Sequence, residues 1–103
     1  MSLASEIVDF KADWYKNAPS DEQAQFRKWL LNLLSTREVV VTFKKKNGEE
    51  RVMRCVANPP TVEDQKPSKP NDETCTVWDL VMNQWRSFKF ENITSVDFQL
   101  ERN

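Results

Sequence analysis

The residues best suited to chemistry lie between Val77 and Ile93, in the segment VWDLVMNQWRSFKFENI. Arg86 directly follows Trp85, and Trp78 lies on the other side of a short turn. A guanidinium group forms paired hydrogen bonds with oxyanions and also stacks on aromatic rings. The segment therefore predicts a site for an anion or a planar ring, with Arg86, Trp85, Trp78 and Lys89 as candidate ligand-binding residues. The alternative is structural: Arg86 pairs with an acid, and the tryptophans pack against helices.

A second group of cations surrounds the Asn47-Gly48 dipeptide. With 15 basic and 16 acidic residues and a net charge of -1, the chain is not expected to coat nucleic acid or a membrane through bulk charge. Only the stretch 37–56 carries a clear positive excess, so nucleic-acid binding is expected to be local. Lysines on edge strands also serve simply to prevent aggregation. The candidate nucleic-acid-binding residues are Lys44, Lys45, Lys46, Arg51 and Arg54.

Catalysis and metal binding have little support in the sequence. There is no histidine, and Cys55 and Cys75 do not form a C-x-x-C pair, so no metal site of the usual zinc types is expected. No P-loop and no G-x-S-x-G motif is present. We therefore expect a non-enzymatic protein without a cofactor. No apolar run reaches the length that crosses a bilayer and no secretory signal is seen, so we expect a cytoplasmic protein with reduced thiols.

Two helices are predicted at the amino-terminal end. Leu3, Ile7, Phe10 and Trp14 recur at the spacing of one helix face, and this stripe is the candidate partner-binding surface, for a homodimer or another protein. After Pro19, Ser20 and Gln23 have the form of a capping box that opens a second helix over about residues 21–35. The apolar stripe of the second helix is Phe26, Trp29, Leu30, Leu33 and Leu34.

Five strands are predicted after residue 38, because the apolar period changes to two. Asn47-Gly48 predicts a type I′ turn that joins the strand from Val39 to one over residues 50–57. Residues 58–73 form a proline-rich loop, and two further strands follow at about 74–81 and 85–90. The last strand alternates through Val96, Phe98 and Leu100.

The register between the third and fourth strands has two alternatives. One places Asp79 opposite Arg86, and the other places Leu80 opposite Arg86. The first is favoured because it pairs an acid with a base and leaves Trp78, Leu80 and Trp85 on an outer face that the helices cover. The predicted fold is α+β: a helical arm over residues 1–37, followed over residues 38–103 by a five-stranded antiparallel SH3-like or Sm-like barrel, with an open sheet as the alternative.

The segment RSFKFENI at residues 86–93 resembles the R-T-F-R-L-D-R-I signature of WYL domains, which are Sm-like barrels of bacterial regulators. Together with VTFKKKNGEERVMRC, it looks like a family of small, divergent WYL-like proteins that are frequent in tailed bacteriophages. The resemblance covers about residues 38–96. The chain departs from it at Glu73, Thr74 and Cys75, where the Trp-Tyr-Leu tripeptide belongs, and at Asn92, where the second arginine belongs.

The resemblance implies a regulatory module that senses a nucleotide or single-stranded nucleic acid, with Arg86 as the ligand-facing basic residue that carries over by position. On this basis we expect a phage-encoded binding module of the host cytoplasm. The alternative is a protein-interaction module that uses the helical arm and the outer aromatic face.

Overall fold

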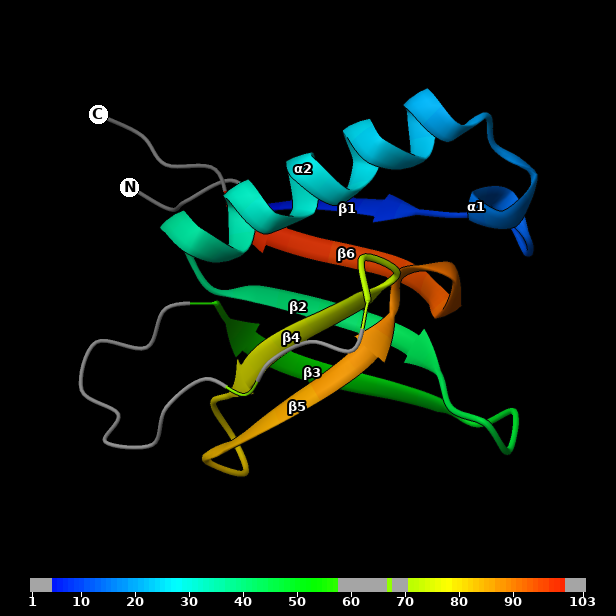
Figure 1. Ribbon diagram of the computed structural model, residues 1–103. Coiled ribbons are helices and arrows are strands. Elements are labelled where there is room, and N and C mark those ends of the chain that lie inside the picture. Colours follow the sequence, from blue (N-terminus) through cyan, green and yellow to red (C-terminus); the bar gives the residue numbers. More distant parts are fainter. Residues whose placement is uncertain (1–4, 58–66, 68–70, 100–103) are drawn as a thin grey trace.

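Residues 5–57, 67 and 71–99 are described by the computed structural model, in which a curved antiparallel sheet lies beside one long helix (Figure 1). The sheet order is β1-β6-β2-β3-β4-β5, so β1 and β5 are its two edges and the sheet is not closed by a β1–β5 ladder. The elements, in chain order, are β1 (Ser5–Asp9), α1 (Trp14–Asn17), α2 (Ser20–Thr36), β2 (Val39–Lys44), β3 (Glu50–Val56), β4 (Thr74–Asp79), β5 (Gln84–Lys89), the 3-10 turn η1 (Phe90–Asn92) and β6 (Ile93–Gln99).

The α+β class is confirmed, but the sheet has six strands where five were predicted. The additional strand is β1, which replaces the predicted first helix and pairs with β6 from Ser5 opposite Gln99 to Asp9 opposite Ser95. Ile7 and Val8 are β-branched and favour this extended conformation. Helix begins only after Asp13, which has a left-handed φ of 62°, and α1 is a single turn.

Helix α2 forms where it was predicted and buries Phe26, Leu30 and Leu34. The predicted capping box is wrong, because the helix begins at Ser20 and its N-cap residue is Pro19, which has no side chain able to cap. Gln23 instead donates a hydrogen bond from Nε2 to the main-chain oxygen of Tyr15, at 2.7 Å. The side chain expected to cap the helix thus ties α2 to α1.

The β2–β3 hairpin forms as predicted, but its turn is not type I′. Of Asn47 and Gly48, only Gly48 has a positive φ, of 87°. The N–H of Gly48 donates to the main-chain oxygen of Lys45 at 2.9 Å, and the N–H of Lys45 donates to that of Glu49 at 2.8 Å. This is a tight turn followed by a glycine bulge, which needs a positive φ at only one position.

Neither predicted register of the β4–β5 hairpin is correct. Asp79 lies opposite Gln84, and Val77 lies opposite Arg86. The turn closes directly after Asp79, because Oδ1 of Asp79 accepts hydrogen bonds from the main-chain N–H groups of Val81 and Met82 at 2.9 and 3.0 Å. Since the shift from the favoured register is two residues, the side chains keep their predicted faces.

Trp78 and Trp85 do share the outer face of this hairpin, with ring centroids 5.3 Å apart. Helix α2, however, packs on the opposite face, where Phe26 and Leu30 belong to one buried cluster with Val77 and Phe88. The prediction that the helices cover the tryptophans is therefore wrong.

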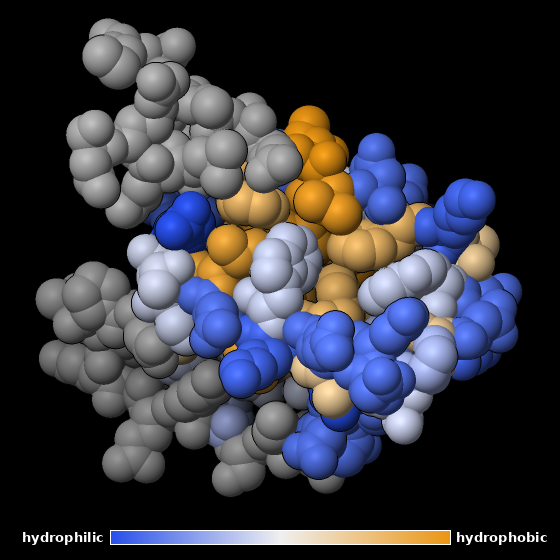
Figure 2. All heavy atoms as spheres, turned by 90° about the horizontal axis from the view of Figure 1, so that it is seen from above, coloured by the Kyte–Doolittle hydropathy of each residue, from blue (hydrophilic) through white to orange (hydrophobic). Residues whose placement is uncertain are grey.

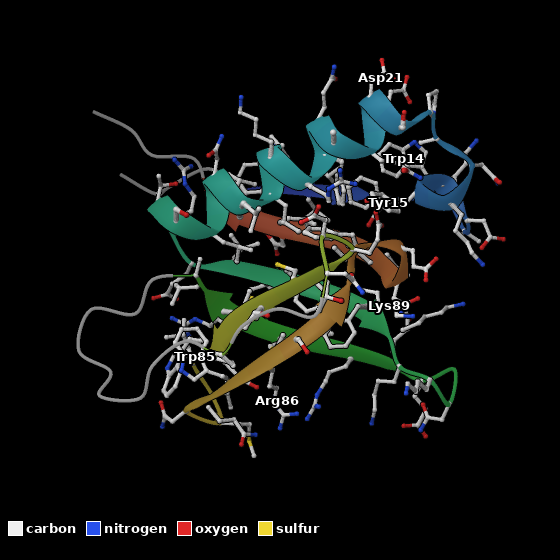
Figure 3. The ribbon with its side chains drawn as sticks, viewed as in Figure 1. Trp14, Tyr15, Asp21, Trp85, Arg86 and Lys89 are labelled. Atoms are coloured by element: carbon white, nitrogen blue, oxygen red, sulfur yellow. The ribbon has the colours of Figure 1, made fainter. Side chains whose placement is uncertain are left out.

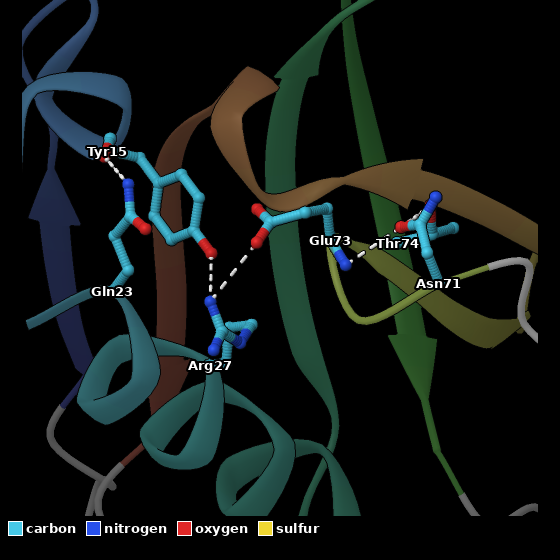
Figure 4. A network of polar contacts seen from close by, with 6 residues as sticks. All are labelled: Tyr15, Gln23, Arg27, Asn71, Glu73 and Thr74. Atoms are coloured by element: carbon cyan, nitrogen blue, oxygen red, sulfur yellow. Dashed lines mark hydrogen bonds and ion pairs between the residues drawn. The ribbon is translucent and has the colours of Figure 1, made fainter. Parts of the chain in front are cut away.

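A polar network ties α1 and α2 to the start of β4 (Figure 4). Nη1 of Arg27 donates to the hydroxyl oxygen of buried Tyr15 at 2.6 Å and lies 3.4 Å from Oε1 of Glu73. Burial of Tyr15 raises the pKa of its hydroxyl above the usual value of 10.0. Asn71 holds the main chain of Glu73 in place, because Oδ1 of Asn71 accepts a hydrogen bond from the main-chain N–H of Glu73 at 2.9 Å.

Of the helices in the described part of the chain, none is both long and apolar enough to cross a membrane. Most of the predicted proline-rich loop (58–66 and 68–70), together with Leu3 and Leu100, lies outside the described residues.

Candidate functional site

An open groove of about 810 Å³ lies between the turn end of the β2–β3 hairpin and strand β5. It collects most of both groups of cations singled out in the sequence, and we call it the basic groove. Its lining comprises six cations, one acid and six further residues: Lys44, Lys45, Lys46, Arg51, Arg86, Lys89, Glu91, Phe43, Thr74, Trp85, Ser87, Phe88 and Asn92.

The floor of the basic groove is a pair of stacked rings. Phe43 on β2 and Phe88 on β5 have ring centroids 4.9 Å apart and planes inclined by 20°. Arg51 lies opposite Phe43 on β3, and Arg86 precedes Phe88 by two residues, so both arginines continue the core-facing rows of their strands. The curl of the sheet brings these rows together, and each row changes from apolar to cationic where it reaches solvent.

The lysines of the hairpin turn and Arg51 supply positive charge that none of the described acidic residues neutralises. Lys44, Lys45 and Lys46 are exposed, and none of them, nor Arg51, makes an ion pair with another residue of the described ranges. Lys89 has an acid nearby, with Nζ 4.0 Å from Oε1 of Glu91. Clustered, solvated cations of this kind are an electrostatic site for phosphate groups.

Arg86 is held differently, because a buried acid neutralises its charge. Nε of Arg86 lies 3.1 Å from Oδ2 of Asp79, whose side chain is only 4% exposed, against 26% for Arg86. With the carboxamide of Gln84 oriented so that its oxygen faces the guanidinium, this oxygen accepts from Nη2 at 2.5 Å. The structural alternative for Arg86 is thus realised, and what remains for a ligand is the part of the guanidinium that faces the groove. Figure 3 shows Trp85, Arg86 and Lys89 along β5.

Two of the residues predicted to bind a ligand or nucleic acid, Trp78 and Arg54, lie outside the basic groove. Trp78 is 8% exposed, so its ring has almost no free face for a base. Arg54 points to the outer face of β3 and pairs with Glu38, with 2.6 Å between Nε and Oε1. Trp85 is half-buried and borders the groove, but its ring packs on Trp78 on the outer face of β5, opposite to the face of Arg86 and Phe88.

The groove also contains residues that the sequence did not indicate as site residues. Phe43 and Phe88 looked like ordinary core positions, and Ser87 and Glu91 carried no signal. Thr74 and Asn92 are different, since both are positions where the chain departs from the WYL pattern. These two positions could have indicated the site, because a residue that aligns with a binding motif lies at the same place in the fold even when its type differs.

The four predicted partner-binding residues do not form one helical stripe. Leu3 lies outside the described residues, and Ile7 is 61% exposed on the outer face of β1. Phe10 and Trp14 lie on the other side, in a second groove of about 400 Å³ between β1 and α2, which we call the aromatic groove. The remaining lining residues are Val8, Glu22, Gln25, Phe26 and Trp29. Figure 3 shows Trp14 beside the start of α2, far from Arg86 on β5.

Both cysteines, Cys55 and Cys75, are buried. Burial raises the pKa of Cys55 to about 12, so the thiol stays protonated near neutral pH and is a poor nucleophile. Cys55 also donates a weak hydrogen bond to the main-chain oxygen of Val39, at 3.6 Å. This side chain behaves as a small apolar residue of the core.

Comparison with known proteins gives one family-level result. The family model described as WYL_2, Sm-like SH3 beta-barrel fold, matches residues 27–94, which is well over half of the chain. The match contains every residue of the basic groove and omits β1 and α1. No significant match was found among curated proteins or among solved structures.

Proposed function

Because the chain belongs to the WYL_2 family, which has the Sm-like SH3 β-barrel fold, we propose that it is a small non-enzymatic, regulatory binding module whose basic groove takes a nucleotide or single-stranded nucleic acid. The observation that supports this most strongly is the unpaired charge at the groove. Lys44, Lys45, Lys46 and Arg51 face one opening without acidic partners in the described part of the chain. Phosphate groups are the ligands that such a cluster attracts.

The aromatic residues of the groove favour a phosphate ester that carries bases over inorganic phosphate. Trp85 borders the same opening as the lysines, and its ring lies on the outer face of the edge strand β5, where a strand that leaves the groove over this edge would reach it. A base that stacks on an aromatic ring contributes roughly 1 to 3 kcal/mol with little sequence preference. Cations at the hairpin turn and a ring on β5 thus match the alternation of phosphate and base in a single strand.

Arg86 has a positioning role in this proposal. Asp79 and Gln84 fix the direction of its guanidinium before a ligand arrives, so little side-chain entropy is lost on binding. The flexible lysines provide attraction over distance, whereas Arg86 provides one oriented contact. From the resemblance to small phage proteins, we infer the cytoplasm of an infected bacterium as the setting of this binding.

The test is fluorescence polarisation with a labelled oligothymidylate of about 12 nucleotides, a length in the range that small β-barrels bind. The variant in which Lys44, Lys45 and Lys46 are all changed to Gln should bind about 10- to 100-fold more weakly at about 50 mM salt. The slope of log affinity against log salt should fall by about 2, since about 0.7 counterions are released per phosphate contact on a single strand.

The matched control is Arg54→Gln, which removes a cation from the same hairpin but from the face away from the groove. It should leave both the affinity and the salt slope within about twofold of wild type. An equal loss of binding free energy per removed charge in the control and in the triple variant would show that binding follows net charge and not the groove. Absence of oligonucleotide and nucleotide binding at low salt would remove the proposal.

A further inference from the structure

Strand β1 lies at an edge of the sheet, and among the described residues only β6 pairs with it. The N–H of Phe10 donates to the main-chain oxygen of Thr94 at 2.9 Å, so the main-chain groups of residues 6, 8 and 10 point toward β6. The main-chain N–H and C=O groups of Ser5, Ile7 and Asp9 therefore point away from the sheet. No other strand of the described residues pairs with β1 on that side.

The aromatic groove opens directly beside this edge. Val8 lies opposite Val96 and faces inward, so the groove lies on the inner side of β1, below the flank of α2 that carries Glu22, Gln25 and Trp29. Phe26 forms its floor and contacts the rings of both Trp14 and Trp29, with centroid distances of 5.4 and 5.9 Å. Phe10, Trp14 and Trp29 keep part of their surface exposed to solvent.

Acidic residues surround the groove on the solvent side. Glu22 lines it, Asp9 is exposed on β1, and Asp13 and Asp21 are exposed near the start of α2. None of these four carboxylates makes an ion pair within the described part of the chain. Figure 2, which looks down on this side of the molecule, shows hydrophobic atoms open to solvent with hydrophilic side chains around them.

We propose that the free edge of β1 and the aromatic groove together bind an extended segment of a partner protein. The segment adds a strand to β1, inserts one bulky apolar side chain into the groove, and carries lysine or arginine next to that side chain. Alternate side chains of an added strand point to one face of the sheet, so a residue that pairs along β1 also faces the groove. The exposed side chain of Ile7 gives the opposite face of the added strand an apolar neighbour.

The charges favour a basic partner over a second copy of the chain. A second copy would add its own Ser5–Asp9 segment, which contains Glu6 and Asp9 and no cation, so it would bring no positive charge to the carboxylates around the groove. A segment flanked by cations neutralises them instead. The surface is also separate from the family's shared part, because the WYL_2 match begins at residue 27 and the groove takes six of its seven lining residues from before that point.

The probe is a panel of fluorescent peptides in which a central tryptophan, leucine or valine alternates with threonine, with lysine or glutamate at both ends. On the full chain, the lysine-ended tryptophan peptide should bind at least about tenfold more tightly than its glutamate-ended counterpart. Ile7→Pro removes one free N–H without breaking a β1–β6 hydrogen bond, and proline is tolerated on such an edge. Ile7→Pro should lower the affinity for the lysine-ended tryptophan peptide about tenfold. The matched Ile7→Thr variant should keep an affinity within about twofold of wild type.

Amide hydrogen exchange gives a readout that needs no substitution. The N–H groups of Ile7 and Asp9 should become protected when the peptide binds, while that of Val8 should be protected with and without the peptide. Failure of the whole panel to bind, or binding without protection of Ile7 and Asp9, would overturn the proposal. If the chain dimerises and Ile7→Pro abolishes the dimer, the edge of β1 binds a second copy, and this result would also overturn the proposal.

Discussion

The basic groove and the aromatic groove differ in how the fold holds their lining residues. In the basic groove the cations stand on a turn and on strand ends, and four of them have no acidic partner among the described residues. In the aromatic groove the rings hold one another, and the floor residue Phe26 also belongs to the buried core. Residues of the basic groove can therefore be substituted with little effect on stability, whereas residues of the aromatic groove also form part of the core.

The largest expected effect on stability comes from Phe26, which lines the aromatic groove and also belongs to the core. Phe26 is 7% exposed and contacts the rings of Phe10, Trp14, Tyr15, Trp29 and Phe90. Phe26→Ala should lower the free energy of unfolding by about 3 to 5 kcal/mol, as other large core aromatics do. Urea denaturation followed by tryptophan fluorescence measures this. A loss below about 1 kcal/mol would mean that the aromatic groove is not continuous with the core.

Arg86 is the exception within the basic groove, and it gives the next largest effect. Arg86→Ala leaves the carboxylate of Asp79 buried without a counter-charge, which should cost about 2 to 3 kcal/mol of stability. The cost should shrink when Asp79→Asn is already present, because no buried charge then remains. A double-mutant cycle by denaturation tests this. Additive costs would show that Asp79 does not depend on Arg86.

This dependence changes how the site must be tested. Sequence reasoning selected Arg86 as the main ligand contact, and the structure places it in a structural pair as well. Lost binding in an Arg86 variant therefore mixes lost contact with lost stability. Arg51 and the three lysines of the hairpin turn report on the ligand alone, since no carboxylate in the described part of the chain pairs with them.

Local signals in the sequence predicted the elements that depend on local physics. The stripe of α2 and the Asn47-Gly48 turn were sufficient to place a helix and a hairpin, because each depends on residues close in the chain. The face that Trp78 and Trp85 share was also predicted correctly. The joining of the two groups of cations was not predictable in this way, since it depends on Phe43 stacking on Phe88 across the curl of the sheet.

The first strand was missed for a related reason. Ile7, Phe10 and Trp14 fit helical spacing, yet Val8 and Phe10 also fit the alternation of a strand whose inner side faces α2. Five residues are too few for either period to decide. The ladder with β6, at the other end of the chain, decides in favour of the strand, and this contact is not visible from residues 5–9 alone.

A smaller effect is expected at the network that connects the two regions. Tyr15→Phe removes the acceptor of the 2.6 Å hydrogen bond from Arg27 and should cost about 1 kcal/mol at neutral pH. The folded protein holds the Tyr15 proton more tightly than the unfolded chain, so its pKa is raised. This contribution is complete below pH 10 and is lost as the pH rises through the folded value.

Denaturation of wild type and of Tyr15→Phe at neutral pH and at about pH 10.5 measures both effects, since tyrosine ionises near pH 10. The stability difference between the two proteins should narrow at the higher pH. A difference that stays constant or widens would mean that the hydroxyl of Tyr15 ionises as easily in the fold as in the unfolded chain.

The smallest expected change in stability is at the lysines of the hairpin turn. Changing Lys44, Lys45 and Lys46 together to Gln should alter the free energy of unfolding by no more than about 0.5 kcal/mol, because their side chains are exposed and make no ion pairs with described residues. The same variant should lose most of its affinity for oligonucleotides. Thermal denaturation and polarisation on one preparation give both numbers. A large loss of stability would show that these lysines help to stabilise the fold. The two grooves would then not differ in how much their lining residues contribute to stability.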